Sequence, residues 1–242
     1  MTRVLIWDLP TRLFHWALAA SFLAAFAIGS LVDDDSAMFA IHMLLGGVAA
    51  FLVVLRLVWG LVGSRWSRFS EFVVSPAEVV AYLRGTLTGD TTRHTGHNPA
   101  TSVAAYVIFA LIIGLAVTGV LMGRAEVFEE IHEVLAWVTI AVVVAHIAGV
   151  VWHTIRCREN IALTMVDGRK EAEASEAIPS ARPVVALVFV ALVGLWTAGL
   201  IAGYDRSGGT VTIPVVGTTF AVGEGAEHGA NEAGQRGEED DD

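Results

Sequence analysis

Five long, nearly unbroken apolar stretches, separated by polar segments, make up nearly half of the 242-residue chain. Each stretch reaches the ~20 residues that an α-helix needs to cross the hydrocarbon core of a bilayer. Because lipid offers the backbone no hydrogen-bonding partner, each stretch is expected to be a helix that satisfies its own amides. The five predicted spans are 13–32, 37–62, 103–123, 131–155 and 184–203.

The composition agrees with a membrane protein. Hydrophobic residues make up 55% of the chain and charged residues only 17%, whereas about a quarter of the residues of a soluble domain are charged. We therefore expect an all-α membrane protein, in which a four-helix transmembrane bundle is followed by a fifth, C-terminal transmembrane helix. The segment that leads into the first span, MTRVLIWDLPTRLFHW, is long and contains an aspartate and a proline. A retained helix is therefore expected there, and not a cleaved signal peptide.

The polar segments divide the chain into four parts. Residues 1–170 are expected to form the four-helix unit, with one long loop at 64–101. That loop contains SPAEVVAYLR, in which Ser75 fits the N-cap and Pro76 the first turn of a short helix. The other parts are a cytoplasmic linker at 171–183, the fifth transmembrane helix at 184–204, and an acidic tail at 205–242 that we expect to be disordered.

Basic residues gather on one side of the predicted membrane. By the positive-inside rule this side is cytoplasmic, which places the N-terminus in the cytoplasm and the C-terminal tail in the periplasm of a bacterial inner membrane. Only three arginines, at 124, 206 and 236, fall on the other side. The residues on the basic side are Arg3, Arg12, Arg65, Arg68, Arg84, Arg93, Arg156, Arg158, Arg169, Lys170 and Arg182.

Three histidines share one stripe of the fourth span, in EIHEVLAWVTIAVVVAHIAGVVWH. His146 follows His132 by fourteen residues and precedes His153 by seven, and both steps return to nearly the same face of a helix. At ~1.5 Å rise per residue, His132 and His146 are ~21 Å apart along the axis. In a hydrocarbon core ~30 Å thick they lie towards opposite faces. One metal ion cannot bind both, but two stacked sites can.

Two other spans offer a second ligand at each level. His15 lies near the cytoplasmic start of the first span and His42 near the outer start of the second. The depths then match in pairs, His42 with His132 and His15 with His146. Two bis-imidazole sites that face the interior of a four-helix bundle are typical of b-type haem. The chain has one cysteine, Cys157, and no Cys-x-x-Cys-His motif, so any haem is bound non-covalently.

Other residues are expected near these sites. Gly46 and Gly47 follow His42 by one turn and leave room for a flat macrocycle. Arg56 follows His42 by fourteen residues, which places it at the inner level, where we expect its guanidinium to pair with a haem propionate. His153 lies at the cytoplasmic boundary, where an interfacial side chain and a contact to a propionate or quinone both remain open interpretations.

The remaining polar and aromatic residues have simpler interpretations. His94 and His97, in RHTGHNPA, are expected to be solvated loop histidines. The seven tryptophans fall mostly near the ends of spans and are expected to be interfacial anchors.

These motifs resemble the bacterial cytochrome b-561 family, which includes the b-type cytochrome subunit of nickel–iron hydrogenases. The similar pieces are WDLPTRLFHW, IHMLLGG, RLVWG, GHNPA and the spacing H-E-x₁₂-H-x₆-H, and they extend over about residues 3–170. The resemblance implies that His15, His42, His132 and His146 bind haem b, and that electrons pass between a periplasmic redox partner and quinone. The fifth span and acidic tail after Arg182 have no counterpart in a four-helix member.

We therefore expect a di-haem b-type cytochrome that transfers electrons across the membrane, with the lipid bilayer, quinone and a periplasmic cytochrome c or hydrogenase-type subunit as partners. Two axial imidazoles leave the iron no vacant position for oxygen chemistry, so no catalytic residue is assigned, and nucleic acid is not an expected partner. Two alternatives remain open: a superoxide or quinone oxidoreductase on the same scaffold, and a proton or metal transporter with a histidine relay. The relay predicts intramembrane carboxylates, which the four spans almost lack.

Overall fold

The computed structural model describes residues 2–33, 36, 38–89, 94–205, 210–215, 217 and 219–221. Within these residues five helices are long and apolar enough to cross a membrane, and they match the five predicted spans to within a few residues. The expected all-α membrane fold is therefore confirmed. The helices are α1 (Leu9–Leu31), α2 (Phe39–Val62), α3 (Pro76–Thr88), α4 (Pro99–Leu121), α5 (Val127–Cys157), α6 (Ile161–Asp167) and α7 (Pro183–Ala202).

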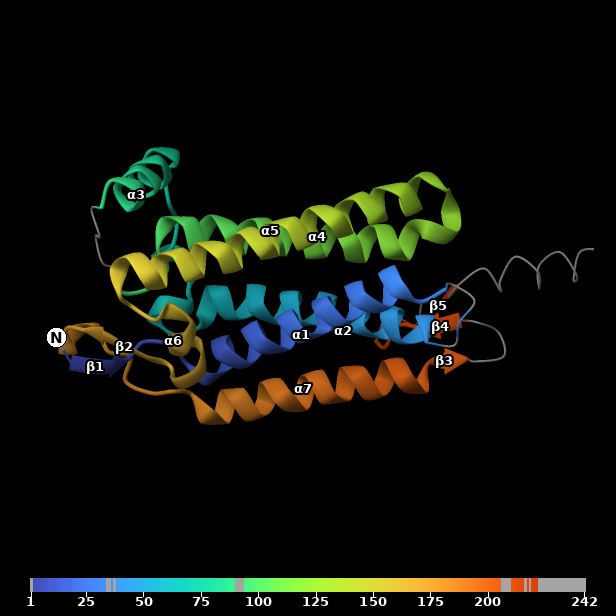
Figure 1. Ribbon diagram of the computed structural model, residues 1–242. Helices are drawn as coiled ribbons and strands as arrows, with labels where there is room; N and C mark the ends of the chain where they lie inside the picture. The colour runs from blue at the N-terminus through green and yellow to red at the C-terminus, as the bar shows by residue number, and fades with distance from the viewer. Residues whose placement is uncertain are drawn as a thin grey trace, which may run out of the picture.

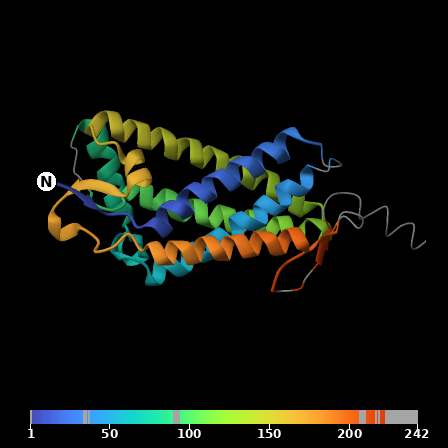
Figure 2. The ribbon, with the colours of Figure 1, turned by 90° about the horizontal axis from the view of Figure 1, so that it is seen from below.

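Two antiparallel helix pairs build the bundle. α1 packs along α2, α4 packs along α5, and α2 joins the pairs by its contact with α4. α7 packs on α1 and α2 from the side away from α4 and α5 (Figure 1). The second view shows the same lengthwise course of all five long helices (Figure 2). Among the described residues, α5 has only marginal contact with α1 and α2, so the two pairs stand apart along one side.

Aromatic and aliphatic side chains fill the space where α1, α2 and α4 meet. Since lipid is as apolar as these side chains, close packing and not escape from water holds the spans together. Phe189 extends this core to α7. The buried members are Phe14, Leu18, Phe22, Ala49, Leu52, Val53, Phe109, Ile112 and Phe189.

A buried carboxylate fixes the start of α1 to the end of α2. Asp8 is fully buried and caps α1 by accepting a hydrogen bond from the Thr11 amide at 2.9 Å. Its other oxygen accepts from Trp59 Nε1 at 3.1 Å, from Ser67 Oγ at 2.9 Å and from the hydroxyl of Ser64. This carboxylate therefore caps the N-terminus of α1 and ties it to side chains at the end of α2 and in the turn that follows.

One end of the bundle, which the sequence predicts to face the cytoplasm and which we call the inner end, carries a small ordered cap. We call the other end the outer end. Strand β1 (Thr2–Leu5) pairs antiparallel with β2 (Arg169–Ala172), and Trp7 and Trp66 are buried beneath them, 3% and 9% exposed. The expectation of interfacial anchors is wrong for these two tryptophans, because chain segments from both ends of the four-helix unit cover them. Residues 171–183, expected to be a linker, contribute the second half of β2 and the turn η4 (Ala174–Glu176) to this cap. Two further 3₁₀ turns, η1 (Arg65–Ser67) and η2 (Phe69–Glu71), follow α2, and η3 (Met122–Arg124) follows α4.

The short helix expected in the long loop is present as α3. Ser75 accepts from the Glu78 amide, and the Glu78 carboxylate accepts from the Ser75 amide, which forms a complete capping box. α3 lies beside the bundle, at the end where α5 finishes (Figure 1).

At the opposite end, part of the predicted tail is folded. Strands β3 (Tyr204–Asp205), β4 (Thr210–Thr212) and β5 (Thr219–Ala221) form an antiparallel sheet after α7. Val211, 8% exposed, turns towards the bundle. The expectation of disorder from residue 205 is therefore wrong for these strands, and residues 222–242 lie outside the described part of the chain.

Candidate functional site

His42 and His132 come together at the outer end of the bundle. Their ring centroids are 6.1 Å apart and the ring planes are inclined at 68°. With metal–imidazole bonds of about 2 Å, two imidazoles on opposite sides of one metal also have centroids about 6 Å apart. The helices therefore hold this pair at the separation that axial coordination needs.

Hydrogen bonds fix the orientation of both rings. His42 Nδ1–H donates to the Ala25 carbonyl at 2.8 Å, which leaves Nε2 as the nitrogen with the lone pair. His132 Nδ1 lies 3.0 Å from Thr118 Oγ1, and that hydroxyl already donates its one hydrogen to the Gly114 carbonyl at 2.9 Å. With that hydrogen on the Gly114 carbonyl, or on the Leu115 carbonyl at 3.2 Å, the Thr118 oxygen is positioned to accept from His132 Nδ1–H, which leaves Nε2 as the nitrogen with the lone pair. Metal-binding histidines are held in this way.

Glycines make the space around these rings. A Cβ at Gly29 would lie 2.8 Å from His42 Nδ1, so the His42 ring leaves no room for a side chain at position 29. Gly46 lines the cavity beside the two histidines, and a Cβ there would meet nothing within 4 Å. Gly47 has another role than expected, because its Cβ would lie 3.1 Å from Leu200 of α7. Gly47 thus admits a neighbouring helix as well as lining the cavity.

An apolar cavity of about 220 Å³ adjoins His42 and His132. Its walls come from α1, α2, α4 and α5, and also from Trp196 on α7 and Val211 on β4. Trp196 Nε1 donates to the Gly47 carbonyl at 3.0 Å and its ring stacks on Phe51 at 4.5 Å. The fifth helix and the outer sheet therefore help to enclose the outer site.

His15 and His146 occupy the inner level, with a looser arrangement. The two rings are close enough to interact electrostatically, although no ring contact joins them among the described residues. His15 Nδ1 is buried and has no hydrogen-bond partner. This nitrogen fits a metal ligand or a hydrogen-bond donor to a bound group, since a buried unpaired polar atom is costly.

Arg56 is buried at the inner level, as the sequence predicts, and is only 3% exposed. Its guanidinium carbon lies 5.4–5.9 Å from the ring centroids of four phenylalanines. Nη1 has no hydrogen-bond partner, and among the described residues no carboxylate forms an ion pair with Arg56. Asp8 interacts with it only at longer range and is engaged by other donors. A cation buried in this way fits an anionic group such as a haem propionate. The four rings belong to Phe14, Phe69, Phe72 and Phe109.

The other histidines differ from their expected settings. His153 is 5% exposed and does not extend to water: Nδ1 lies 2.9 Å from Tyr82 Oη, and Nε2 lies 3.4 Å from a Glu159 carboxylate oxygen. His94 stacks edge-on against Tyr82 at 5.6 Å. His97 packs on Trp7 and Phe72 and is not a solvated side chain. These contacts could not be predicted from the sequence pattern, because they depend on how α3 and the segment around Trp7 fold back against the end of the bundle.

The outer pair has room for a planar metal macrocycle, because glycines and an apolar cavity adjoin His42 and His132. At the inner level His15 and His146 offer a second pair of imidazoles, beside the buried Arg56. Within the described residues no group of three or more His, Cys, Asp or Glu side chains could hold a bare metal ion. A metal whose equatorial ligands come from the macrocycle needs only the two imidazoles at each level.

Comparison with known proteins identifies relatives of this chain. The family described as prokaryotic cytochrome b561 matches residues 6–168. A probable Ni/Fe-hydrogenase B-type cytochrome subunit of Cupriavidus necator is 28% identical over 207 residues, covering 67% of this chain and 85% of the relative. Proteins of the same description from Rhizobium leguminosarum and Bradyrhizobium diazoefficiens are 24% and 22% identical, each covering 69% of this chain and 88% and 86% of the relative. No solved structure matches significantly.

Proposed function

Because this chain belongs to the prokaryotic cytochrome b561 family, a family of haem b proteins that transfer electrons across membranes, we propose that it does so with two haems, one at each level of the bundle. His42 and His132 are the proposed ligands of the outer haem, and His15 and His146 those of the inner haem. The main support for this proposal is the 6.1 Å separation of the His42 and His132 ring centroids. In each ring Nδ1 takes part in a hydrogen bond, so that Nε2 is the nitrogen available to bind a metal.

The protein contributes position and electrostatic environment to this chemistry. A bound haem would supply one-electron transfer, and the two histidines proposed at each level would hold it. The ~21 Å rise between His132 and His146 along α5 spaces the two sites across most of the hydrocarbon core. Arg56 offers a positive charge at the inner level that favours the reduced form of the nearby haem.

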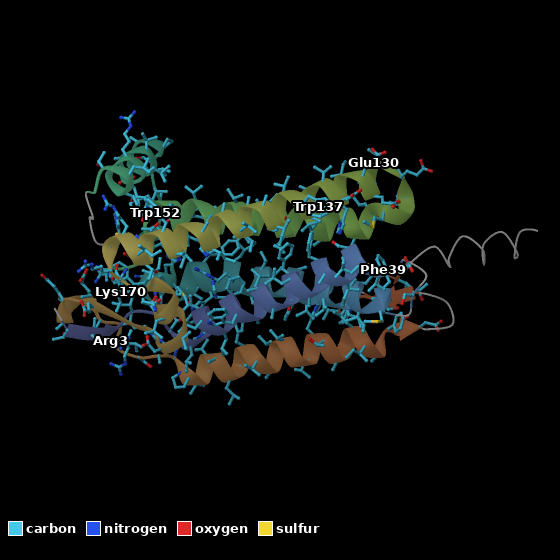
Figure 3. All side chains as sticks on the ribbon, in the orientation of Figure 1. Arg3, Phe39, Glu130, Trp137, Trp152 and Lys170 are labelled. Carbon is cyan, nitrogen blue, oxygen red and sulfur yellow. The ribbon has the colours of Figure 1, made fainter. Side chains whose placement is uncertain are left out.

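The charge distribution supports an orientation. Arg3 and Lys170 lie at one end of the bundle, and Phe39 and Glu130 at the other (Figure 3). We propose that the end with Arg3 faces the cytoplasm of a bacterial inner membrane. On this orientation the outer haem faces a periplasmic redox partner and the inner haem faces the quinone pool. The relatives named as Ni/Fe-hydrogenase subunits support a hydrogenase-type partner, and a cytochrome c is the other candidate.

Haem stoichiometry in single variants tests the ligand assignment. The wild-type protein should bind two haems per chain by pyridine haemochrome assay. His42→Ala and His132→Ala should each lose the same haem, identified by its midpoint potential, and His15→Ala and His146→Ala should each lose the other. His94→Ala is the matched control, because this histidine lies outside the bundle and should leave both haems bound. A wild-type count of one, or loss of different haems from His42→Ala and His132→Ala, contradicts the proposal.

A further inference from the structure

His97 is held rigidly at the inner end of the bundle. Its ring centroid lies 4.4 Å from that of Phe72 and 4.7 Å from that of Trp7, the latter in an edge-on contact. The next residue, Asn98, caps α4 by accepting from the Thr101 amide at 2.9 Å. The side chain is therefore clamped between two aromatic rings on a segment that a helix cap anchors.

One nitrogen of this clamped ring is directed into the protein interior. His97 Nδ1 is buried and makes no hydrogen bond with any described group. A buried polar nitrogen without a partner is costly, so a position of this kind normally faces a ligand or an ordered water. Burial first, and then the positive charge of Arg56, lower the pKa of His97 to about 3. The ring is therefore neutral near pH 7 and can offer a hydrogen bond but no charge.

His97 belongs spatially to the inner site. It interacts electrostatically with Arg56, His15 and His146, and Phe72 contacts both the His97 ring and the Arg56 guanidinium. Arg56 Nη1 also lacks a partner. Guanidinium groups only donate hydrogen bonds, so Arg56 and His97 cannot satisfy each other unless His97 accepts. A third group that accepts from both would satisfy the two nitrogens, and next to a buried cation a carboxylate is the most favourable acceptor.

We propose that His97 is a second hydrogen-bond donor, beside Arg56, to a carboxylate of the inner cofactor, which on the proposed function is a haem propionate. The proposal rests on that function, because it requires a haem at the inner level. Arg56 supplies the charge that holds the carboxylate, and the His97 ring supplies direction. Together they make the electrostatic potential of the carboxylate at the haem less negative, which favours the reduced state of the haem.

Two substitutions separate the donor from the ring. His97→Phe keeps an aromatic ring between Trp7 and Phe72 but removes both nitrogens. His97→Asn loses the ring but places an amide N–H near the position of Nδ1. His94→Phe is the control, since it changes a histidine of the same loop that contacts Tyr82. Each variant is purified as the full chain, depleted of quinone, counted for haem and titrated with the two haem potentials resolved.

His97→Phe should lower the midpoint potential of the inner haem and leave the outer one unchanged. We expect about a threefold shift in the ratio of oxidised to reduced inner haem, which corresponds to ~28 mV for one electron. His97→Asn should recover most of this shift, and His94→Phe should show none. In reduced-minus-oxidised infrared spectra, the carboxylate band of ¹³C-propionate haem should move in His97→Phe only. Loss of the inner haem from His97→Phe but not from His97→Asn also supports the proposal.

Other results overturn it. An unchanged inner potential in a two-haem His97→Phe protein refutes the role of His97 while leaving the proposed function intact. Loss of the inner haem from both variants assigns His97 to packing alone. A shift that appears only after quinone is added assigns the acceptor to a quinone carbonyl. A wild-type count of one haem refutes the proposed function itself, and this proposal with it.

Discussion

The hydroxyl group of Thr118 sets the chemical state of one proposed haem ligand. Thr118 Oγ1 accepts from His132 Nδ1–H, because its own hydrogen is donated to the Gly114 carbonyl. An acceptor at Nδ1 makes the imidazole a stronger electron donor to a metal at Nε2. On the proposed ligand assignment, we expect this bond to stabilise the oxidised form of the outer haem.

Thr118→Val should raise the midpoint potential of the outer haem and leave the inner haem unchanged. Loss of one hydrogen bond of about 1 kcal/mol corresponds to roughly 40 mV for a one-electron couple. Thr118→Ser keeps the acceptor and should behave like the wild type. Thr139→Val is a matched control, because the Thr139 hydroxyl bonds only to the Leu135 carbonyl within α5. An equal shift from Thr139→Val would show that the effect is not specific to His132.

At this scale the sequence predicts the four histidines and Arg56 but not their partners. A helical repeat determines depth and face, and these are enough to pair His42 with His132. Whether a side chain finds a hydrogen bond depends on the neighbouring helix. Thr118 lies on α4, which contains no histidine, so the pattern of histidines does not point to it. His97 is covered by Trp7, which lies ninety residues earlier in the chain.

At the scale of elements, α2 presents two adjacent glycines that serve different neighbours. Gly47 contacts Leu200 on α7, whereas a Cβ at Gly46 has open space beside the outer histidines. Gly46→Leu should therefore fill the cavity and reduce the haem count from two to one, with little effect on apoprotein folding. Gly194→Leu on exposed α7, where a Cβ also meets nothing within 4 Å, should keep both haems. Haemochrome counts of the two purified variants decide the matter, and two haems in Gly46→Leu would place the macrocycle elsewhere.

The junction of α3 with α5 gives a prediction for acid stability. Burial raises the pKa of Glu159, but interactions with His153 and Lys170 lower it by more than burial raises it, so the net pKa is below the ordinary 4.5. A carboxylate with a depressed folded-state pKa stabilises the protein above its unfolded pKa and loses this effect as the pH falls through the folded value. When the pH falls below about 4.5, the temperature of half-unfolding should therefore decrease by more in the wild type than in Glu159→Gln. Glu126→Gln, at an exposed position, should follow the wild type, and an equal drop in Glu159→Gln would contradict the assignment.

The elements themselves were largely predictable. Apolar length determines a membrane helix almost alone, and the Ser75 capping box marks the start of α3. The strands were not predictable, because β1 and β2 are four residues each and pair across nearly the whole four-helix unit. A strand this short is stable only when it is paired, and nothing in the sequence of Thr2–Leu5 indicates that Arg169–Ala172 is its partner.

At the scale of the whole molecule, the segment after α7 is part of the outer site. Val211 and Ile213 line the cavity next to His42 and His132. Truncation after Gly203 removes this wall, and we expect the outer haem to transfer to apomyoglobin about tenfold faster, as loss of ~1.4 kcal/mol of apolar cover implies. Truncation after Ala221 keeps β5 and should leave the transfer rate unchanged. Equal rates for the two truncations would mean that the sheet does not cover the haem.

The division of the bundle into two helix pairs has a consequence for biogenesis. His15 and His42 belong to the first pair, whereas His132 and His146 both belong to α5, the last helix of the four. A ribosome therefore delivers one half of each proposed haem site long before the other, and neither site is complete until α5 has entered the bilayer. Loading of either proposed site therefore has to wait for α5, and because α5 packs mainly on α4, we expect a bound haem to strengthen its attachment to the first pair. In a cell short of haem, the apoprotein would then expose a loosely attached hairpin to membrane proteases, so that haem supply would govern how much of this protein survives.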